Sequence, residues 1–262
     1  MNSSAWHRVG LLSASLGNLI FLYAPIGILI VFSFNAARLP TEWQGFSLQW
    51  YEALARDHAL LVALRNSVLI AVASTVIATI LGVSAAIGLE RLPWRRRAWL
   101  EGALLLPLVM PEIMMGVALL LLFVLVKMPL GLLTVTIGHA AFNVPVVMVI
   151  VRSRLRRLDP QLEEAARDLG ATPWQAFRRV TLPLLQPAVV GAALLACTVS
   201  LDDFVVTFFT AGPGATTLPL KVYSMIKTGI SPEINALSTI LVVASMGMVG
   251  LSLLFQRKAA HG

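Results

Sequence analysis

The chain has 262 residues, of which 58% are hydrophobic and only 13% are charged, and its formal net charge is +7. Its apolar stretches are long enough to cross a bilayer, so the composition indicates an integral membrane protein and excludes a soluble globular domain. The basic excess does not indicate a nucleic-acid partner, because the arginines lie at the ends of apolar stretches without interleaved aromatic residues.

Six apolar stretches reach the length of about 20 residues that a membrane-spanning helix needs. They predict an all-α membrane protein with a single domain over residues 1–262 and six spans, at about 9–34, 67–89, 103–126, 130–151, 188–211 and 234–256. The first stretch is too long for the apolar region of a cleaved signal peptide, so we expect an uncleaved anchor. Prolines inside the third and fourth spans predict kinks: Pro107, Pro111 and Pro145.

The basic residues predict the orientation of the chain, because cytoplasmic segments are enriched in lysine and arginine. With a cytoplasmic N-terminus, the inner segments hold 14 of the 20 basic residues: one near the N-terminus, four at 91–97, seven at 152–179 and two at 257–258. We therefore expect both termini and the 152–187 segment in the cytoplasm. The outer loops are then at about 35–66 and 212–233.

Three acidic residues, Glu112, Asp202 and Asp203, lie inside predicted spans. A charge there costs ~2.5 to 3.5 kcal/mol on insertion scales and usually faces a partner or a cavity. No lysine or arginine lies in the interior of a span, so a cation is the natural partner. On the fifth span the residues at three- and four-residue steps form one polar stripe of the helix, namely Ser200, Asp203, Thr207 and Thr210, so Asp203 is expected to face water or substrate. Asp202 is turned about 100° away from the stripe and could be structural.

Two further polar residues, His139 and Asn143, share a face of the predicted fourth span. The candidates for a substrate path are therefore Asp203, Asp202, Glu112, Thr207, His139 and Asn143. A structural alternative stays open for each of them. Buried carboxylates can be protonated and hydrogen-bonded to a neighbouring span, and His139 and Asn143 can be hydrogen-bond partners between helices.

Between the fourth and fifth spans, apolar residues recur at helical spacing and predict an amphipathic helix: Leu155, Leu158, Leu162, Ala165, Ala166 and Leu169. Gly170 ends this helix. Thr172 and Gln175 form a capping box that starts a second short helix at Pro173. The small residues before Gly170 leave a shallow surface suited to another protein, although a helix lying on the membrane surface is the alternative.

Motifs of enzymes are missing. No phosphate-binding loop of the form G-x-x-x-x-G-K-[ST] occurs, the four histidines are scattered, and neither H-E-x-x-H nor G-x-S-x-G is found. The single cysteine, Cys197, falls inside the fifth predicted span, which excludes a disulfide framework and a thiol metal cluster. We therefore predict a transport subunit rather than an enzyme, without a metal site or a cofactor of its own.

One motif follows the fourth predicted span: Glu164-Ala165-Ala166, then Gly170, Val180 and Leu182-Pro183. Its residues and their spacing resemble the E-A-A loop of permease subunits in bacterial binding-protein-dependent ABC importers. Val180, where that family often has isoleucine, is a mild departure. The resemblance implies a type I importer permease fold, with residues 153–187 as a helix-turn-helix coupling loop that fits a groove on a separate ATPase. The implied coupling residues are Glu163, Glu164, Ala165, Ala166, Gly170, Leu182 and Pro183.

Within that family, the residues at 106–112, 200–204, 218–224 and 231–236 are similar to the second permease of spermidine/putrescine systems. The resemblance implies a subunit of the bacterial inner membrane, in contact with lipid. Its implied partners are a second permease chain, two ATPase subunits that hold ATP and Mg²⁺, and a periplasmic solute-binding protein. The intramembrane acidic residues independently suit a polycation.

Other functions stay open. The same type of importer can carry an amino acid, ferric ion or an organophosphonate. A secondary transporter or channel could instead use Glu112, His139 and Asp203 as an ion relay without any ATPase. A membrane-embedded enzyme would need a nucleophile, base or metal constellation that the spacing does not supply.

Overall fold

The computed structural model describes residues 3–37, 42–159, 161–229, 232–243 and 246. In these ranges the chain is helical apart from loops and one isolated bridge between Asn35 and Phe46. It divides into two compact units, Met1–Leu60 with Val222–Gly262, and Leu61–Lys221. The single domain predicted over residues 1–262 stays a prediction.

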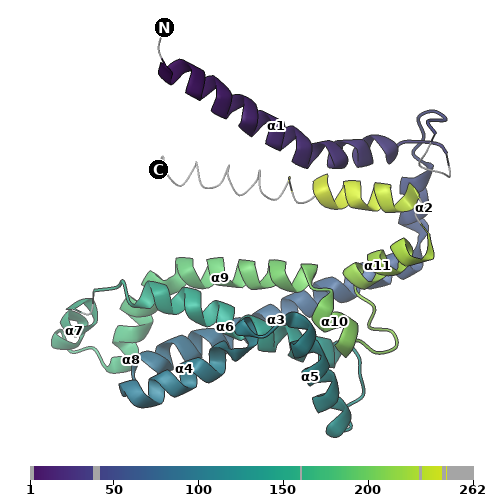
Figure 1. Ribbon diagram of the computed structural model, residues 1–262. Coiled ribbons are helices and arrows are strands. Elements are labelled where there is room, and N and C mark those ends of the chain that lie inside the picture. Colours follow the sequence, from purple (N-terminus) through teal and green to yellow (C-terminus); the bar gives the residue numbers. More distant parts are fainter. Residues whose placement is uncertain (1–2, 38–41, 160, 230–231, 244–245, 247–262) are drawn as a thin grey trace. The chain divides into compact units, whose positions relative to one another are not determined.

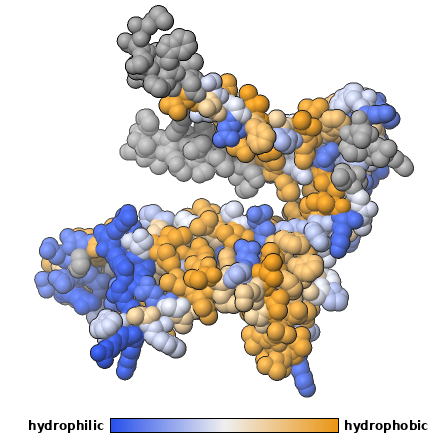
Figure 2. Space-filling view, in the orientation of Figure 1, coloured by the Kyte–Doolittle hydropathy of each residue, from blue (hydrophilic) through white to orange (hydrophobic). Residues whose placement is uncertain are grey.

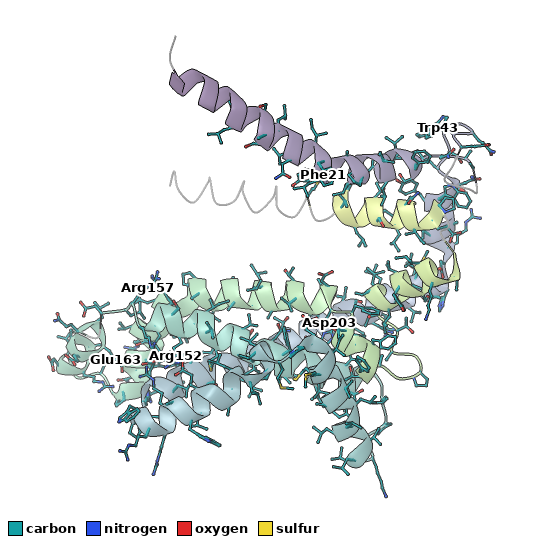
Figure 3. All side chains as sticks on the ribbon, in the orientation of Figure 1. Phe21, Trp43, Arg152, Arg157, Glu163 and Asp203 are labelled. Carbon is teal, nitrogen blue, oxygen red and sulfur yellow. The ribbon has the colours of Figure 1, made fainter. Side chains whose placement is uncertain are left out.

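The first unit contains α1 (Ser3–Phe32), α2 (Gln49–Arg56), most of α11 (Leu218–Thr228) and an unlabelled helix at Pro232–Val243. The α1 helix exposes large apolar side chains, Phe21 among them (Figure 3), as a helix surrounded by lipid does. After α1 the chain folds around Asn35, whose side-chain amide donates to the Glu42 carbonyl at 2.6 Å. The Asn35 carbonyl accepts the indole N–H of Trp50 at 2.7 Å.

The second unit is a bundle centred on α6 (Figure 1). The α6 helix packs against α4, α9 and α10, and α5 packs against α10. The core of the second unit consists of small and branched apolar residues such as Ala78, Val147 and Leu185. The helices are α3 (His58–Glu90), α4 (Trp94–Val109), α5 (Glu112–Leu125), α6 (Leu132–Leu155), α7 (Gln161–Asp168), α8 (Pro173–Ala176), the π-helix η1 (Phe177–Thr181), α9 (Leu182–Asp202) and α10 (Val205–Thr210).

Four helices in the described residues are long and apolar enough to cross a membrane: Leu11–Phe32, His58–Glu90, Leu132–Leu155 and Pro173–Asp202. They overlap the first, second, fourth and fifth predicted spans. The first part of the sixth predicted span, 234–256, falls within the helix Pro232–Val243, whereas residues 244–245 and 247–256 lie outside the described residues. Around α7 the surface of the second unit is hydrophilic, whereas hydrophobic side chains cover its middle (Figure 2).

The third predicted span, 103–126, is not one straight helix. It is divided into α4 and α5, which are bent by 106° relative to each other. Pro111 has no N–H to continue the α4 hydrogen bonds and forces the preceding Met110 into an extended conformation, with φ −72° and ψ 140°. Pro107 and Pro145 are accommodated inside α4 and α6.

The fifth predicted span, 188–211, is also interrupted. The α9 helix ends at Asp202, Asp203 is extended with φ −65° and ψ 121°, and α10 begins at Val205. The prediction of one unbroken helix was therefore wrong at this point. The physical reason is the Asp203 side chain, which accepts the backbone N–H groups of Val206 at 3.3 Å and Thr207 at 2.8 Å and so starts a new helix.

Candidate functional site

Both interrupted spans border one pocket in the second unit. The pocket has a volume of about 340 Å³ and is lined by Glu112, Phe142, Val199, Asp202, Asp203, Phe204, Val205 and Val206. Glu112 is the first residue of α5 and Asp202 is the last residue of α9. The three acidic residues singled out in the sequence, which come from two different spans, thus lie around a single cavity.

Asp203 is bound by donors of the protein itself. Its Oδ2 atom lies 3.0 Å from Nε2 of His139 and accepts the hydroxyl of Thr207 at 2.8 Å. Only 14% of its side chain is exposed. Glu112 and Asp202 are exposed by contrast, so their carboxylates are the accessible ones in the pocket.

A buried polar network lies behind Asp203 and joins four helices. His139 on α6 is 3% exposed, and its Nδ1 atom lies 2.7 Å from the hydroxyl of Ser200 on α9. Its Nε2 atom lies 2.8 Å from the hydroxyl of Thr207 on α10, and Ser200 is in turn 3.0 Å from the hydroxyl of Ser74 on α3. Buried polar groups need such partners, because an unsatisfied one costs about 1 to 3 kcal/mol.

The other predicted path residues lie away from the pocket surface. Thr207 and His139 are buried and hold Asp203, which fits the structural alternative for His139. Asn143 is also buried, and its Oδ1 atom has no hydrogen-bond partner among the described residues. A direct role of these three residues in the substrate path stays a prediction.

The second predicted site, the turn after α7, has the expected local geometry. Gly170 follows the helix with φ +88°, a left-handed conformation that glycine adopts at no steric cost. The predicted capping box is present: Thr172 Oγ1 accepts the N–H of Gln175 at 3.3 Å, and Gln175 Oε1 accepts the N–H of Thr172 at 2.9 Å. Two helices therefore meet at a tight, defined turn.

Both helices differ in length from the prediction. Leu155 is the last residue of α6, so the predicted amphipathic helix is divided and its second part is α7. The second helix is not short, because α8, η1 and α9 form one helix over Pro173–Asp202. The π-helical turn has a local cause: Pro183 cannot donate a hydrogen bond, and the N–H of Leu182 reaches back to the carbonyl of Phe177.

The predicted coupling residues form an accessible surface. Glu164, Ala165, Gly170, Leu182 and Pro183 are exposed, and Glu163 and Ala166 are partly exposed. Two large apolar side chains flank the turn: Leu169 is 90% exposed and Trp174 is 66% exposed. Exposed apolar groups beside small residues are typical of a protein-binding surface.

An ion-pair network near this turn was missed in the sequence. Arg152 on α6 has a 6% exposed side chain and pairs with Glu101 on α4 and, at 2.5 Å, with Glu90 on α3. Glu90 also pairs with Arg156 at 2.8 Å and Arg97 at 3.3 Å. The sequence signal was the presence of two glutamates within a basic region, but we read those arginines only as markers of orientation. Figure 3 shows Arg152 and Glu163 at the α7 end of the unit and Asp203 farther along α9.

Comparisons with known proteins agree with the family that the sequence motif resembles. Residues 78–259 match the family described as binding-protein-dependent transport system inner membrane component. The chain is 43% identical over 242 residues to the spermidine/putrescine transport system permease protein PotC of Escherichia coli K12, covering 92% of each protein. It is 45% identical over 237 residues to the putrescine transport system permease protein PotI of the same strain, covering 88% of this chain and 84% of PotI.

A more distant relative is the putative 2-aminoethylphosphonate transport system permease protein PhnV of Salmonella paratyphi A, at 28% identity over 240 residues, with 89% of this chain and 88% of PhnV covered. Among solved structures, a bacterial ABC transporter involved in the import of alginate has a TM-score of 0.71 at 18% identity, with 98% of both chains covered. The MetNI methionine transporter has a TM-score of 0.61 at 18% identity, over 75% of this chain and 95% of that chain. These two likenesses concern the fold alone.

Proposed function

Because the chain belongs to the family of binding-protein-dependent transport system inner membrane components, we propose that it is a permease subunit through which an ATP-driven importer moves putrescine or spermidine into the cytoplasm. The observation that carries the substrate class is the pocket that Glu112, Asp202 and Asp203 line together. Its lining residues include no lysine, arginine or histidine. The pocket therefore attracts a polycation.

Two further features of the pocket suit an alkyl polyamine. The last carbonyl groups of α9 carry partial negative charge, which favours a cation at that end. Phe142 and Phe204 add aromatic rings, which attract ammonium groups and pack against methylene segments. In this proposal Glu112 and Asp202 contact the amine, and Asp203 contributes its charge from the wall.

The same pocket disfavours the main rival within the family. A phosphonate or another anion would meet carboxylates of like charge there. PhnV, the relative with 2-aminoethylphosphonate in its name, is also more distant from this chain than PotC and PotI. Both observations favour an amine over an organophosphonate.

The architecture that we propose has six spans, with both termini and the 153–187 coupling loop in the cytoplasm. The four long apolar helices, the bent α4–α5 pair and the apolar helix at Pro232–Val243 support six crossings. The exposed surface around Gly170, Leu169 and Trp174 is the proposed contact with an ATPase subunit. The outer loops at 35–66 and 212–233 face the periplasmic binding protein.

The proposed complex contains this chain, a second homologous permease, two ATPase subunits that hold ATP and Mg²⁺, and a periplasmic solute-binding protein. No cofactor is assigned to this chain. Closure of the ATPases displaces the coupling loop, and the helices alternate between outward-facing and inward-facing states. Each ligand shifts this equilibrium only by the difference in its affinity for the two states.

Reconstitution of the complex in liposomes tests this function. We expect uptake of radiolabelled putrescine or spermidine that requires internal ATP and the loaded binding protein, with an importer lacking active ATPase subunits as the control. Uptake of an amino acid, ferric ion or a phosphonate in place of amines would refute the substrate class. Uptake by this chain alone, without ATP, would instead identify a secondary transporter or channel.

A further inference from the structure

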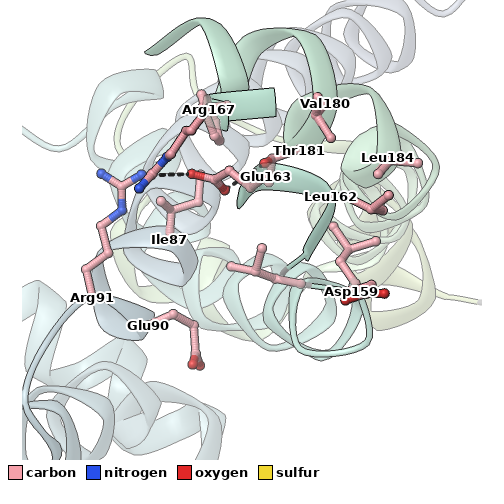
Figure 4. Close-up of a pocket in the computed structure, with 13 residues that line it drawn as sticks. Ile87, Glu90, Arg91, Asp159, Leu162, Glu163, Arg167, Val180, Thr181 and Leu184 are labelled. Atoms are coloured by element: carbon pink, nitrogen blue, oxygen red, sulfur yellow. Dashed lines mark hydrogen bonds and ion pairs between the residues drawn. The ribbon is translucent and has the colours of Figure 1, made fainter. Parts of the chain in front are cut away.

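The α7 helix packs against α8 and η1. One polar contact reaches from it into the following long helix: Glu163 Oε2 accepts the hydroxyl of Thr181 at 3.0 Å. Glu163 Oε1 accepts Nη2 of Arg167 at 2.7 Å, one turn further along α7. Figure 4 shows the Glu163 carboxylate between Arg167 and Thr181.

Next to this contact, beside α7, there is open space rather than a packed core. A cavity of about 390 Å³ is lined by residues of α3, of the segment after α6, of α7, of η1 and of α9. Its lining includes Ile87, Leu158, Leu162 and Leu184 (Figure 4). A helix beside an unfilled cavity can shift at lower cost than one in a close-packed core.

The position of Thr181 within the long helix Pro173–Asp202 determines which part of that helix moves when α7 shifts. Thr181 is the last residue of η1, and the regular α9 helix follows it directly. A π-helical turn is a poorer, rarer geometry than an α-helix and is a point of local adjustment. A force applied before that turn would be absorbed in it, whereas one applied at Thr181, its last residue, acts directly on the start of α9.

Thr181 is also suited to hold a carboxylate firmly. It is 8% exposed, so its hydroxyl is largely shielded from water, whereas the Glu163 side chain that it meets is 28% exposed. A hydrogen bond to a charged group is stronger than one between two neutral groups. The Arg167 pair lies at the surface of α7 and serves to orient Glu163, because exposed i,i+4 pairs contribute little by themselves.

We propose that Thr181 is a positioning residue of energy coupling: its hydrogen bond to Glu163 transmits displacement of α7 past the π-helical turn into α9, which ends at the acidic pocket. This inference rests on the proposed function, because it assigns the displacement of α7 to the partner ATPase. It adds a residue that faces the interior and does not contact the ATPase.

Thr181→Val in the reconstituted complex tests the assignment, because valine keeps the branched shape and removes only the hydroxyl. We measure amine import and ATP hydrolysis on the same liposomes. The complex is expected to assemble in wild-type yield and to hydrolyse ATP, while amine imported per ATP falls about tenfold. Thr181→Ser, which restores the donor, is expected to return the ratio to near the wild-type value.

A matched control is Thr136→Val, since the Thr136 hydroxyl bonds to the Leu132 carbonyl of its own helix. Its import ratio is expected to stay that of the wild type. Glu163→Ala removes the same Thr181 bond from the partly exposed side and provides a second route should valine prevent assembly. The double variant Glu163→Ala/Thr181→Val is expected to lose no more than Glu163→Ala alone, because that single variant already removes the Thr181 bond together with the Arg167 pair.

An unchanged import ratio in Thr181→Val would overturn the proposal, and so would multiplying losses in the double variant. Failure of the proposed function is distinguishable, because the wild-type complex would then import no amine. If it imported another solute, the ratio of that solute to ATP would test Thr181 in the same way.

Discussion

Asp202 and Asp203 are neighbours in the chain, yet their carboxylates have different surroundings. Asp203 lies 3.0 Å from the buried ring of His139 and accepts the backbone N–H of Thr207 at the start of α10. Asp202 is exposed at the end of α9. Removal of one charge therefore affects the folded structure, and removal of the other affects only what the pocket attracts.

We expect Asp203→Asn to lower the thermal stability of the purified protein by a few degrees, because weakening buried contacts of a charged group costs on the order of 2 kcal/mol. Asp202→Asn is expected to keep the stability and to raise the KM for amine uptake several-fold. Thermal unfolding in detergent and uptake kinetics measure the two effects. Equal stability of both variants would show that the His139 contact contributes nothing.

The residues of this site could be selected from the sequence, but not their roles. Charged residues within an apolar span can be identified directly from the sequence, so Glu112, Asp202 and Asp203 could be chosen without a structure. Which spans face each other is set by packing over many residues, so the sequence could group His139 with Asp203 as polar residues of two spans but could not show that the two side chains are in direct contact. Arg152 was misread for the same reason, because its two glutamates come from other helices.

At the scale of elements, a close approach of α3 to α6 depends on a glycine. A Cβ atom at Gly82 would lie 2.7 Å from Cβ of Val147 and 2.9 Å from the carbonyl oxygen of Val144. Such approach between small residues is how membrane helices pack tightly. A Cβ atom at Gly88, about two turns later on α3, would meet no atom of the described residues within 4 Å.

Gly82→Ala is therefore expected to push α3 and α6 apart and to lower the yield of folded protein, since overpacking costs about 1 to 3 kcal/mol. Gly88→Ala provides the matched control and is expected to be neutral or stabilising by up to about 1 kcal/mol, because alanine favours a helix. Size-exclusion chromatography after mild heating compares them. A normal yield for Gly82→Ala would mean that the helices separate without loss.

The existence of the helices could be predicted, but their ends could not. Apolar length indicated where helices lie, and capping signals correctly placed the start at Pro173. The break at Pro111 and the continuation of the Pro183 region into α9 involve the same residue type with opposite results. In the first case the preceding residue is extended, and in the second a π-helical turn bypasses the missing donor.

For the whole molecule, the distribution of basic residues makes the orientation testable. A fluorescent protein fused after Gly262 is expected to be fluorescent, because it folds in the cytoplasm. Alkaline phosphatase fused after Lys127 is expected to be active outside, and the same enzyme fused after Leu158 to be inactive. The reverse pattern would place the E-A-A turn on the wrong side for an ATPase and contradict the topology.

The uninterrupted helix from Thr181 to Asp202 has an evolutionary consequence. The α9 helix contains 21 residues, and each residue adds about 100° of rotation and about 1.5 Å of rise. Inserting or deleting a single residue would turn Asp202 away from the pocket while Thr181 kept its place beside Glu163. Natural relatives that transport the same solute should therefore vary in sequence along this segment but never in its length.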